Sequence, residues 1–173
     1  AIDGSINSHS FYNGVSVGLY RGGYVCFQSG KQVRMNDLSD PVILGKLYTP
    51  TNILIITKDH LEAIYDELLE LEPVKKFIAF LGTKTDDIFP LKKEVICQSL
   101  SILLDFAQEV IEWSLIYEVA TRSEINAGDF ILIDGDLRSE KIKQQHLVKL
   151  GKFINEKKIH LIGITKNSPI KME

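Results

Sequence analysis

The stretch Phe130-Ile131-Leu132-Ile133-Asp134-Gly135-Asp136-Leu137 decides how this chain is organised. It is a short apolar run that ends in a carboxylate followed at once by a glycine. A run of this kind predicts a buried strand, and the glycine permits a sharp turn directly after the acid. We therefore expect Asp134 to be presented at the end of a strand, at the edge of a sheet.

The beginning of the chain repeats this arrangement, because Ala1-Ile2-Asp3-Gly4-Ser5 also places Asp-Gly after small and apolar residues. If the two strands lie side by side, Asp3 and Asp134 come together despite their separation in the sequence. Carboxylates held on a rigid sheet suit a hard divalent cation, so the two strand ends predict a metal site. The alternative is that each acid only stabilises a turn, since Asp-Gly is a common turn dipeptide.

Length and composition indicate one globular unit. A chain of 173 residues with 45% hydrophobic content is long enough for one well-buried core, so we expect a single domain over residues 1–173. Its first residue, Ala1, already lies inside a strand motif, which suggests a trimmed, longer natural protein. Cys26 and Cys97 are too far apart in sequence for a CxxC zinc motif, and we expect both to pack in the core of a cytoplasmic protein. No apolar run approaches the roughly 20 residues of a membrane helix.

Charge is distributed unevenly along the chain. From Asp134 onward there are nine basic and five acidic residues, a balance of +4, so residues 1–133 carry −7 of the total of −3. This asymmetry permits a phosphate-facing side, although the lysines could equally form the solvated face of an amphipathic helix. A net acidic chain holds DNA poorly by counterion release, so productive binding would require self-association, with a homodimer expected, or a ring-shaped ATPase.

The remaining pattern predicts an α/β fold with a mixed sheet of about five strands flanked by helices. We expect a hairpin that turns at Gly22-Gly23, preceded by a polar loop. The apolar run at 53–57 could be a strand or the start of a helix. The other predicted segments are a packed run at 42–48, helices at 59–71, 75–81, 92–121 (with one break) and 140–156, loops at 6–13 and 82–90, and strands at 15–20, 24–27 and 159–165.

Together these motifs resemble the NurA nucleases, whose fold is like that of ribonuclease H. The resemblance rests on Asp3-Gly4-Ser5 in a first strand, a glutamate on a long helix, Asp134-Gly135-Asp136-Leu137 after an apolar strand, and a last strand with Leu161-Ile162-Gly163-Ile164-Thr165-Lys166. By order of elements it covers nearly the whole chain, and residues 28–95 follow it only loosely. The chain departs from the family at Asp136, where the family has Ser or Pro, and it lacks the family's histidine after the last strand. The domain is therefore expected to be truncated relative to the full family pattern.

The resemblance implies a metal-dependent DNA nuclease. Members of the family degrade DNA from the 5′ end with manganese, and they work with the hexameric HerA translocase in end processing and repair. It implies that Asp3 and Asp134 are catalytic metal ligands for Mn²⁺ or Mg²⁺. The extra acid Asp136 could add a ligand or cap the next helix. A single-strand endonuclease activity is a further expectation.

The third ligand is expected on the long helix, where Asp105, Glu109 and Glu112 share one face by their spacing and Glu118 points elsewhere. We select Glu112 as a catalytic metal ligand, because it is embedded among apolar residues, and keep Glu109 as the alternative. Lys166 and Ser5 are the candidate substrate-binding residues. An ordinary surface lysine is an equal alternative for Lys166, and a role in stabilising the turn after Asp3 is the favoured alternative for Ser5.

A second hypothesis assigns this chain to a different functional class. A ribonuclease H-like domain that has lost catalysis could serve as an adaptor or DNA-binding module for an ATPase partner. The missing histidine favours this adaptor, and the retained acids favour the nuclease. Because one fold hosts many functions, the choice between them depends on the site.

Overall fold

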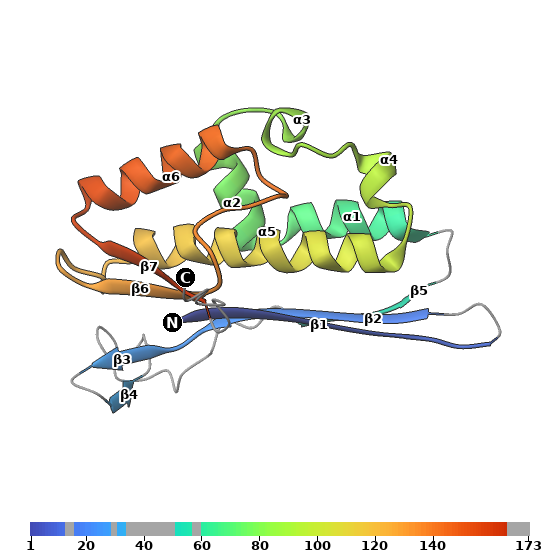
Figure 1. Ribbon diagram of the computed structural model, residues 1–173, viewed down its shortest axis with the longest axis horizontal. Coiled ribbons are helices and arrows are strands. Elements are labelled where there is room, and N and C mark those ends of the chain that lie inside the picture. Colours follow the sequence, from blue (N-terminus) through green and yellow to red (C-terminus); the bar gives the residue numbers. More distant parts are fainter. Residues whose placement is uncertain (13–15, 29–30, 34–50, 57–59, 166–173) are drawn as a thin grey trace, which may run out of the picture.

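The computed structural model describes residues 1–12, 16–28, 31–33, 51–56 and 60–165, and it forms a sheet with a layer of helices over one face (Figure 1). The predicted packed run at 42–48 and the residue Lys166 lie outside this described part. The elements in chain order are β1 Ile2–Ser10, β2 Ser16–Tyr24, β3 Cys26–Gln28, β4 Lys31–Val33, β5 Thr51–Ile56, α1 Leu61–Glu70, α2 Glu72–Leu81, α3 Thr85–Ile88, α4 Lys93–Ile96, α5 Leu100–Thr121, β6 Phe130–Asp134, α6 Gln144–Glu156 and β7 His160–Ile164.

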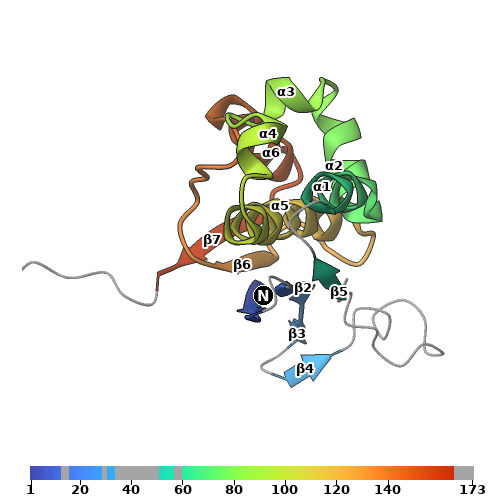
Figure 2. The ribbon, with the colours of Figure 1, turned by 90° about the vertical axis from the view of Figure 1, so that its right-hand side faces the viewer.

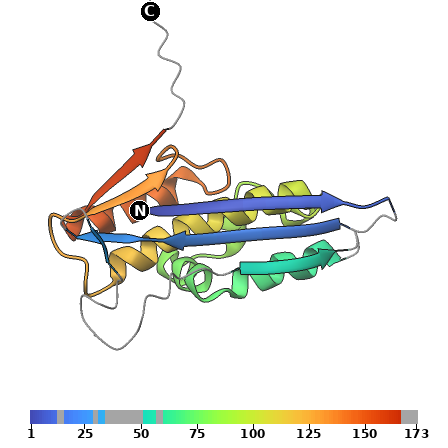
Figure 3. The same ribbon diagram turned by 90° about the horizontal axis from the view of Figure 1, so that it is seen from below.

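The main sheet has five strands in the order β5-β2-β1-β6-β7 (Figure 3). The β1–β2 and β2–β5 pairs are antiparallel, whereas β1–β6 and β6–β7 are parallel. This mixed sheet, with a three-stranded antiparallel meander on one side and parallel strands on the other, confirms the predicted ribonuclease H-like α/β fold. The order also confirms that the first strand and the Asp134 strand are parallel neighbours.

One face of the sheet is covered by α5, with the other helices stacked beyond it (Figures 1 and 2). Alternate residues of β2 point toward this layer, so Tyr20 and Tyr24 are buried while Arg21 between them is exposed. The central part of α5 is apolar on most of its surface because it packs against both the sheet and α2. We call the opposite side, which no described helix covers, the open face.

The long helical pattern contains one break, as the sequence pattern allowed, although its position was not predicted. Residues 97–99 separate α4 from α5, and the Ser99 hydroxyl caps the new helix by accepting a hydrogen bond from the Ile102 N–H at 3.3 Å. Pro73 opens α2, since proline is tolerated in a first helical turn. The undecided run near residue 53 is strand β5, and a short helix, α3, lies inside the predicted loop at 82–90.

The predicted turn at Gly22-Gly23 is wrong. Strand β2 runs straight through both glycines, and the hairpin is instead formed by β1 and β2, paired from Ile2–Tyr24 to Ser10–Ser16. The predicted loop at 6–13 is therefore largely strand. Gly22 faces α5, where an added Cβ would collide with the side chain of Ile111. The glycine is required because the helix approaches the strand closely, and no turn is involved.

No helix in the described ranges is long and apolar enough to cross a membrane. Cys26 and Cys97 are both free thiols, half-buried against the core as expected. Burial raises the pKa of each thiol above its ordinary value.

Candidate functional site

The ends of β1 and β6 bring the two Asp-Gly motifs together. Ile2 pairs with Ile133 in the parallel ladder, so Asp3 and Asp134 are the next residues on adjacent strands. Strand β6 stops at Asp134, whereas β1 continues to Ser10. Beyond this point the edge of β1 lacks its β6 neighbour, and the Gly4 carbonyl accepts a hydrogen bond from Gln108 Nε2 at 3.1 Å. The predicted adjacency of the two strand ends is confirmed.

Helix α5 places Glu112 directly over β1. A Cβ added at Gly4 would lie 2.5 Å from Glu112 Oε1, so only glycine leaves room for this carboxylate. Gln108, one turn earlier on the helix, donates a hydrogen bond from Nε2 to Glu112 Oε1 at 3.2 Å. The same amide nitrogen thus contacts both the Gly4 carbonyl and the Glu112 carboxylate. Glu112 is half-buried and faces the sheet, as its apolar neighbours in the sequence predicted.

Burial raises the pKa of the Glu112 carboxyl, and the charges of Asp3 and Glu109 raise it further. The Gln108 hydrogen bond and a hydrogen bond with the Gly4 backbone act in the opposite direction. Asp3 and Glu109, whose charges raise this pKa, are both carboxylates. A bound cation would relieve this repulsion, so the donor chemistry suits a hard metal ion such as Mn²⁺ or Mg²⁺.

Glu112 and Asp134 line the same hollow, which has a volume of about 750 Å³ and is bounded by α5 and the segment after β6. Asp136, Asp105 and Glu109 line it as well. Asp136 does not cap the next helix, because α6 begins at Gln144 with Lys143 as its N-cap residue. The position of Asp136 therefore disagrees with a helix cap and agrees with the other interpretation, an additional ligand beside Glu112 and Asp134.

Asp3 lines a different, smaller hollow of about 430 Å³, together with Ser5 and Arg21. Asp3 and Ser5 are exposed and alternate with the buried Ile2 and the half-buried Gly4, so they point to the open face. The structure therefore brings Glu112 and Asp134 to one hollow and leaves Asp3 beside them, close enough to influence the pKa of Glu112.

Within the described ranges, no three side chains of His, Cys, Asp or Glu gather closely enough to form a metal site on their own. Magnesium-type sites are commonly built from one or two carboxylates, with water and substrate phosphate oxygens completing the shell. Glu112 and Asp134, which line one hollow, supply oxygen donors of this kind. Glu112 and Asp134 fit such a cation, whereas Asp3 points to the open face, so it would join them only by reaching the ion past the end of β6.

Glu109, the alternative helix ligand, has a different partner. Its Oε1 accepts a hydrogen bond from the Glu140 backbone N–H at 3.1 Å. In the same segment the Ser139 hydroxyl accepts from the N–H groups of Lys141 and Ile142, at 3.0 and 2.8 Å. Glu109 thus anchors the segment after β6 to α5 and helps to set the position of Asp134 relative to Glu112.

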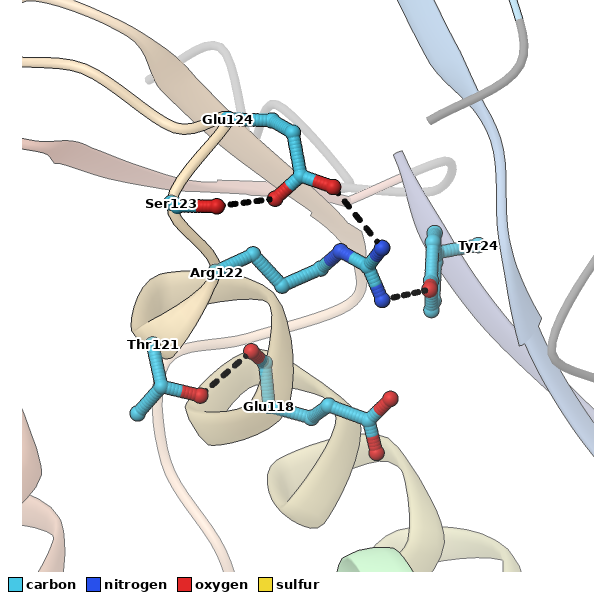
Figure 4. A network of polar contacts seen from close by, with 6 residues as sticks. All are labelled: Tyr24, Glu118, Thr121, Arg122, Ser123 and Glu124. Atoms are coloured by element: carbon cyan, nitrogen blue, oxygen red, sulfur yellow. Dashed lines mark hydrogen bonds and ion pairs between the residues drawn. The ribbon is translucent and has the colours of Figure 1, made fainter. Parts of the chain in front are cut away.

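Sequence reasoning missed Gln108 and a polar cluster at the end of α5. Gln108 could have been found, since it precedes the selected Glu112 by one helical turn. The cluster is shown in Figure 4, where Arg122 donates hydrogen bonds to the Tyr24 hydroxyl at 3.3 Å and to the Glu124 carboxylate at 3.0 Å. Ser123 also donates to Glu124, at 3.1 Å. These contacts tie the end of the helix to the end of β2.

Neither a scan of protein families nor searches of curated proteins and of solved structures finds a match to this chain. The functional argument therefore depends on the site itself.

The raised pKa of Glu112 predicts how stability depends on pH. Between its unfolded and its folded pKa, the native state binds more protons at this carboxyl, so without metal its contribution to stability falls as pH rises through that window. Glu112→Gln is expected to raise the metal-free melting temperature at neutral pH, with the difference from the parent disappearing at pH values below the unfolded pKa. Thermal melts in EDTA across pH 4 to 8 measure this. A variant with a lower melting temperature than the parent at neutral pH would show that the folded protein stabilises the charged form of the Glu112 carboxylate.

Proposed function

We propose that this protein is a divalent-metal-dependent deoxyribonuclease with Asp3, Glu112 and Asp134 as its catalytic metal ligands. The observation that supports this most strongly is the position of the half-buried Glu112 carboxylate, which shares a hollow with Asp134. Burial and the charges of neighbouring acids raise the pKa of this carboxyl group. A carboxyl group in a hollow whose pKa is shifted by burial and by a neighbouring charge marks a candidate functional site. The ribonuclease H-like strand order agrees with this proposal.

In this proposal each residue has a separate task. Glu112 and Asp134 would hold Mn²⁺ or Mg²⁺, with Asp3 of the adjacent strand as the third proposed ligand. Such an ion would supply an activated water and stabilise the leaving oxygen in phosphodiester cleavage. Gln108 orients Glu112 through its hydrogen bond, and Glu109 fixes the segment that follows Asp134. Ser5 on the open face and Lys166, outside the described residues, are the proposed substrate contacts.

Basic side chains near the acids support a phosphate substrate. Arg138 and Lys141 line the same hollow as Glu112 and Asp134. Other lysines of this region have internal partners, since Lys143 Nζ donates to the Asp86 carbonyl at 3.0 Å and Lys149 Nζ donates to the Leu81 carbonyl at 2.9 Å. The proposed phosphate path therefore follows Arg138 and Lys141 and does not include Lys143 and Lys149.

By the family resemblance we further propose that the enzyme degrades DNA in the 5′ to 3′ direction, with single-strand endonuclease activity, in cytoplasmic DNA end processing and repair. Its proposed partners are a HerA-type hexameric ATPase and a second copy of the chain in a homodimer.

Digestion of labelled DNA with manganese, with and without EDTA, tests the proposal. We expect manganese-dependent release of short products, blocked by EDTA and by Glu112→Gln. The matched control is Glu67→Gln, an exposed glutamate on α1 that should cleave like the parent. A preparation that stays inert with manganese, magnesium and the ATPase would overturn the nuclease assignment.

The second candidate is a catalytically impaired adaptor for the ATPase. It is favoured by one observation, the lack of a three-residue cluster of ligating side chains among the described residues. The adaptor would bind the ATPase with unchanged affinity when Glu112 and Asp134 are both replaced, and it would cleave no DNA under any metal condition.

A further inference from the structure

Two hollows lie next to each other where β2 passes into β3, and we refer to the pair as the β3 groove. The wider hollow, about 640 Å³, is bounded by β3, the beginning of β6 and residues 123–129. The narrower one, about 430 Å³, contains Asp3, Ser5 and Arg21. Ala1, Tyr24 and Val25 line both hollows, so the two are neighbours. The short β3–β4 pair stands below the main sheet on this side (Figure 1).

Two exposed aromatic rings line the wider part of the groove. The side chains of Phe27 and Phe130 are 57% and 61% exposed. Phe130 also stacks on His160 of the next strand, with ring centroids 5.0 Å apart and planes inclined by 26°. Exposed aromatic groups gathered at one hollow indicate a surface that is covered by a ligand, and flat rings are best covered by another flat ring.

Charge in this wider part disfavours a phosphate. Its acids are Glu124, which is paired with Arg122 at 3.0 Å, and Asp129, whose Oδ2 accepts the Asn126 N–H at 2.8 Å. No lysine or arginine of the described chain lines it. An uncharged planar group is therefore favoured here, and the amides of Asn126 and Gln28 at its rim can hydrogen-bond to such a group.

The narrower end of the groove has the opposite character. Arg21 is exposed on the open face and lies directly across from Ser5 in the β1–β2 ladder. Asp3 lies across from Gly23, so no side chain faces it from β2. Arg21 forms no ion pair with any described residue. A guanidinium in an open hollow suits a phosphate, which it can bind through two parallel hydrogen bonds.

We propose that the β3 groove binds one unpaired strand of the DNA substrate, with a nucleobase against Phe27 and Phe130 and a backbone phosphate at Arg21. The inference rests on the proposed function for the identity of the strand, and it adds a base-binding site away from the metal ligands. The strand would pass Asp3 on its way between the two contacts. A duplex keeps its base faces stacked on each other, so only an unpaired base can cover these rings.

Fluorescence anisotropy of a labelled oligothymidine in EDTA, where no cleavage interferes, tests this groove. Phe27→Ala and Phe130→Ala are each expected to weaken binding roughly 5- to 100-fold, the loss typical of one stacked base. Phe11→Ala is the matched control, because Phe11 is also exposed but lies beyond the far end of β1. A strand of the same length without bases should bind the parent and the phenylalanine variants alike. Arg21→Gln should reduce the slope of log affinity against log salt concentration by about 1, which corresponds to one lost phosphate contact. Lys152→Gln on α6 should leave this slope unchanged.

The outcomes separate this inference from the proposed function. If Phe27→Ala and Phe130→Ala bind the oligothymidine like the parent, or if the parent binds blunt duplex as tightly as the single strand, the base site is wrong and the nuclease proposal is untouched. If both variants lose binding while manganese supports no cleavage, the groove stands and the nuclease proposal fails. A parent with no measurable affinity for the oligothymidine would overturn the groove.

Discussion

Asp134→Asn is expected to reduce manganese-dependent DNA cleavage by at least about 100-fold while the protein remains folded. A lost metal ligand should cost no less than the 10- to 100-fold loss known for groups that merely support ligands. The asparagine keeps the size of the side chain at the end of β6 and removes one negative charge from the hollow that Glu112 and Asp136 also line. The metal-free stability should therefore stay the same or rise slightly. Asp3→Asn is expected to behave in the same way.

Manganese binding provides a second measurement on the same variants. At a free concentration of 100 times its dissociation constant, a bound ion stabilises the parent by about 2.7 kcal/mol, and this gain should be lost in Asp134→Asn. Asp86→Asn is the matched control, because Asp86 is an exposed aspartate on α3 away from the site. If manganese raised the melting temperature of Asp3→Asn and Asp134→Asn as much as that of the parent, these residues would not be the ligands.

The parallel half of the sheet could be predicted from the sequence because its strands are nearly continuous apolar runs. Residues 130–134 and 160–164 are β-strands in the structure, and the amphipathic segment between them contains α6. The Asp-Gly pair after each run also placed Asp3 and Asp134 on neighbouring strands, as the β1–β6 pairing confirms. Local patterns sufficed here because a short apolar run bounded by turn residues predicts a strand, even though Phe130, Ile162 and Ile164 are exposed in the structure.

The antiparallel half was harder because one face of β1 is exposed. Ser5, Asn7 and His9 all point away from the helices, so the second half of this strand has the composition of a loop. Its partner is determined by the long pairing with β2, which a local pattern does not contain. For the site, spacing on α5 grouped Glu109 with Glu112, but only the three-dimensional contacts show that Glu109 binds the Glu140 N–H while Glu112 lies over Gly4.

Gly22→Ala is expected to destabilise the protein by about 1 to 3 kcal/mol, which is the usual cost of inserting an extra carbon into a well-packed core. The added methyl group would collide with Ile111 of α5, and Leu115 lies only 3.1 Å from the same position. Either the helix moves away from β2 or the Ile111 side chain leaves its preferred rotamer. Because α5 also carries Glu112, a displaced helix should weaken manganese binding as well. Urea denaturation and manganese titration of the same preparation measure both effects.

The adjacent glycine provides the matched control. Gly23 alternates with Gly22 along β2 and so faces the open side of the sheet, opposite Asp3. Gly23→Ala adds the same methyl group without approaching α5, and replacing a glycine inside a strand should leave stability unchanged or raise it by up to about 1 kcal/mol. If the two glycines instead formed a turn, the two variants would be affected to a similar degree. A large difference between them is therefore the result expected from a straight strand with a helix packed closely on one side.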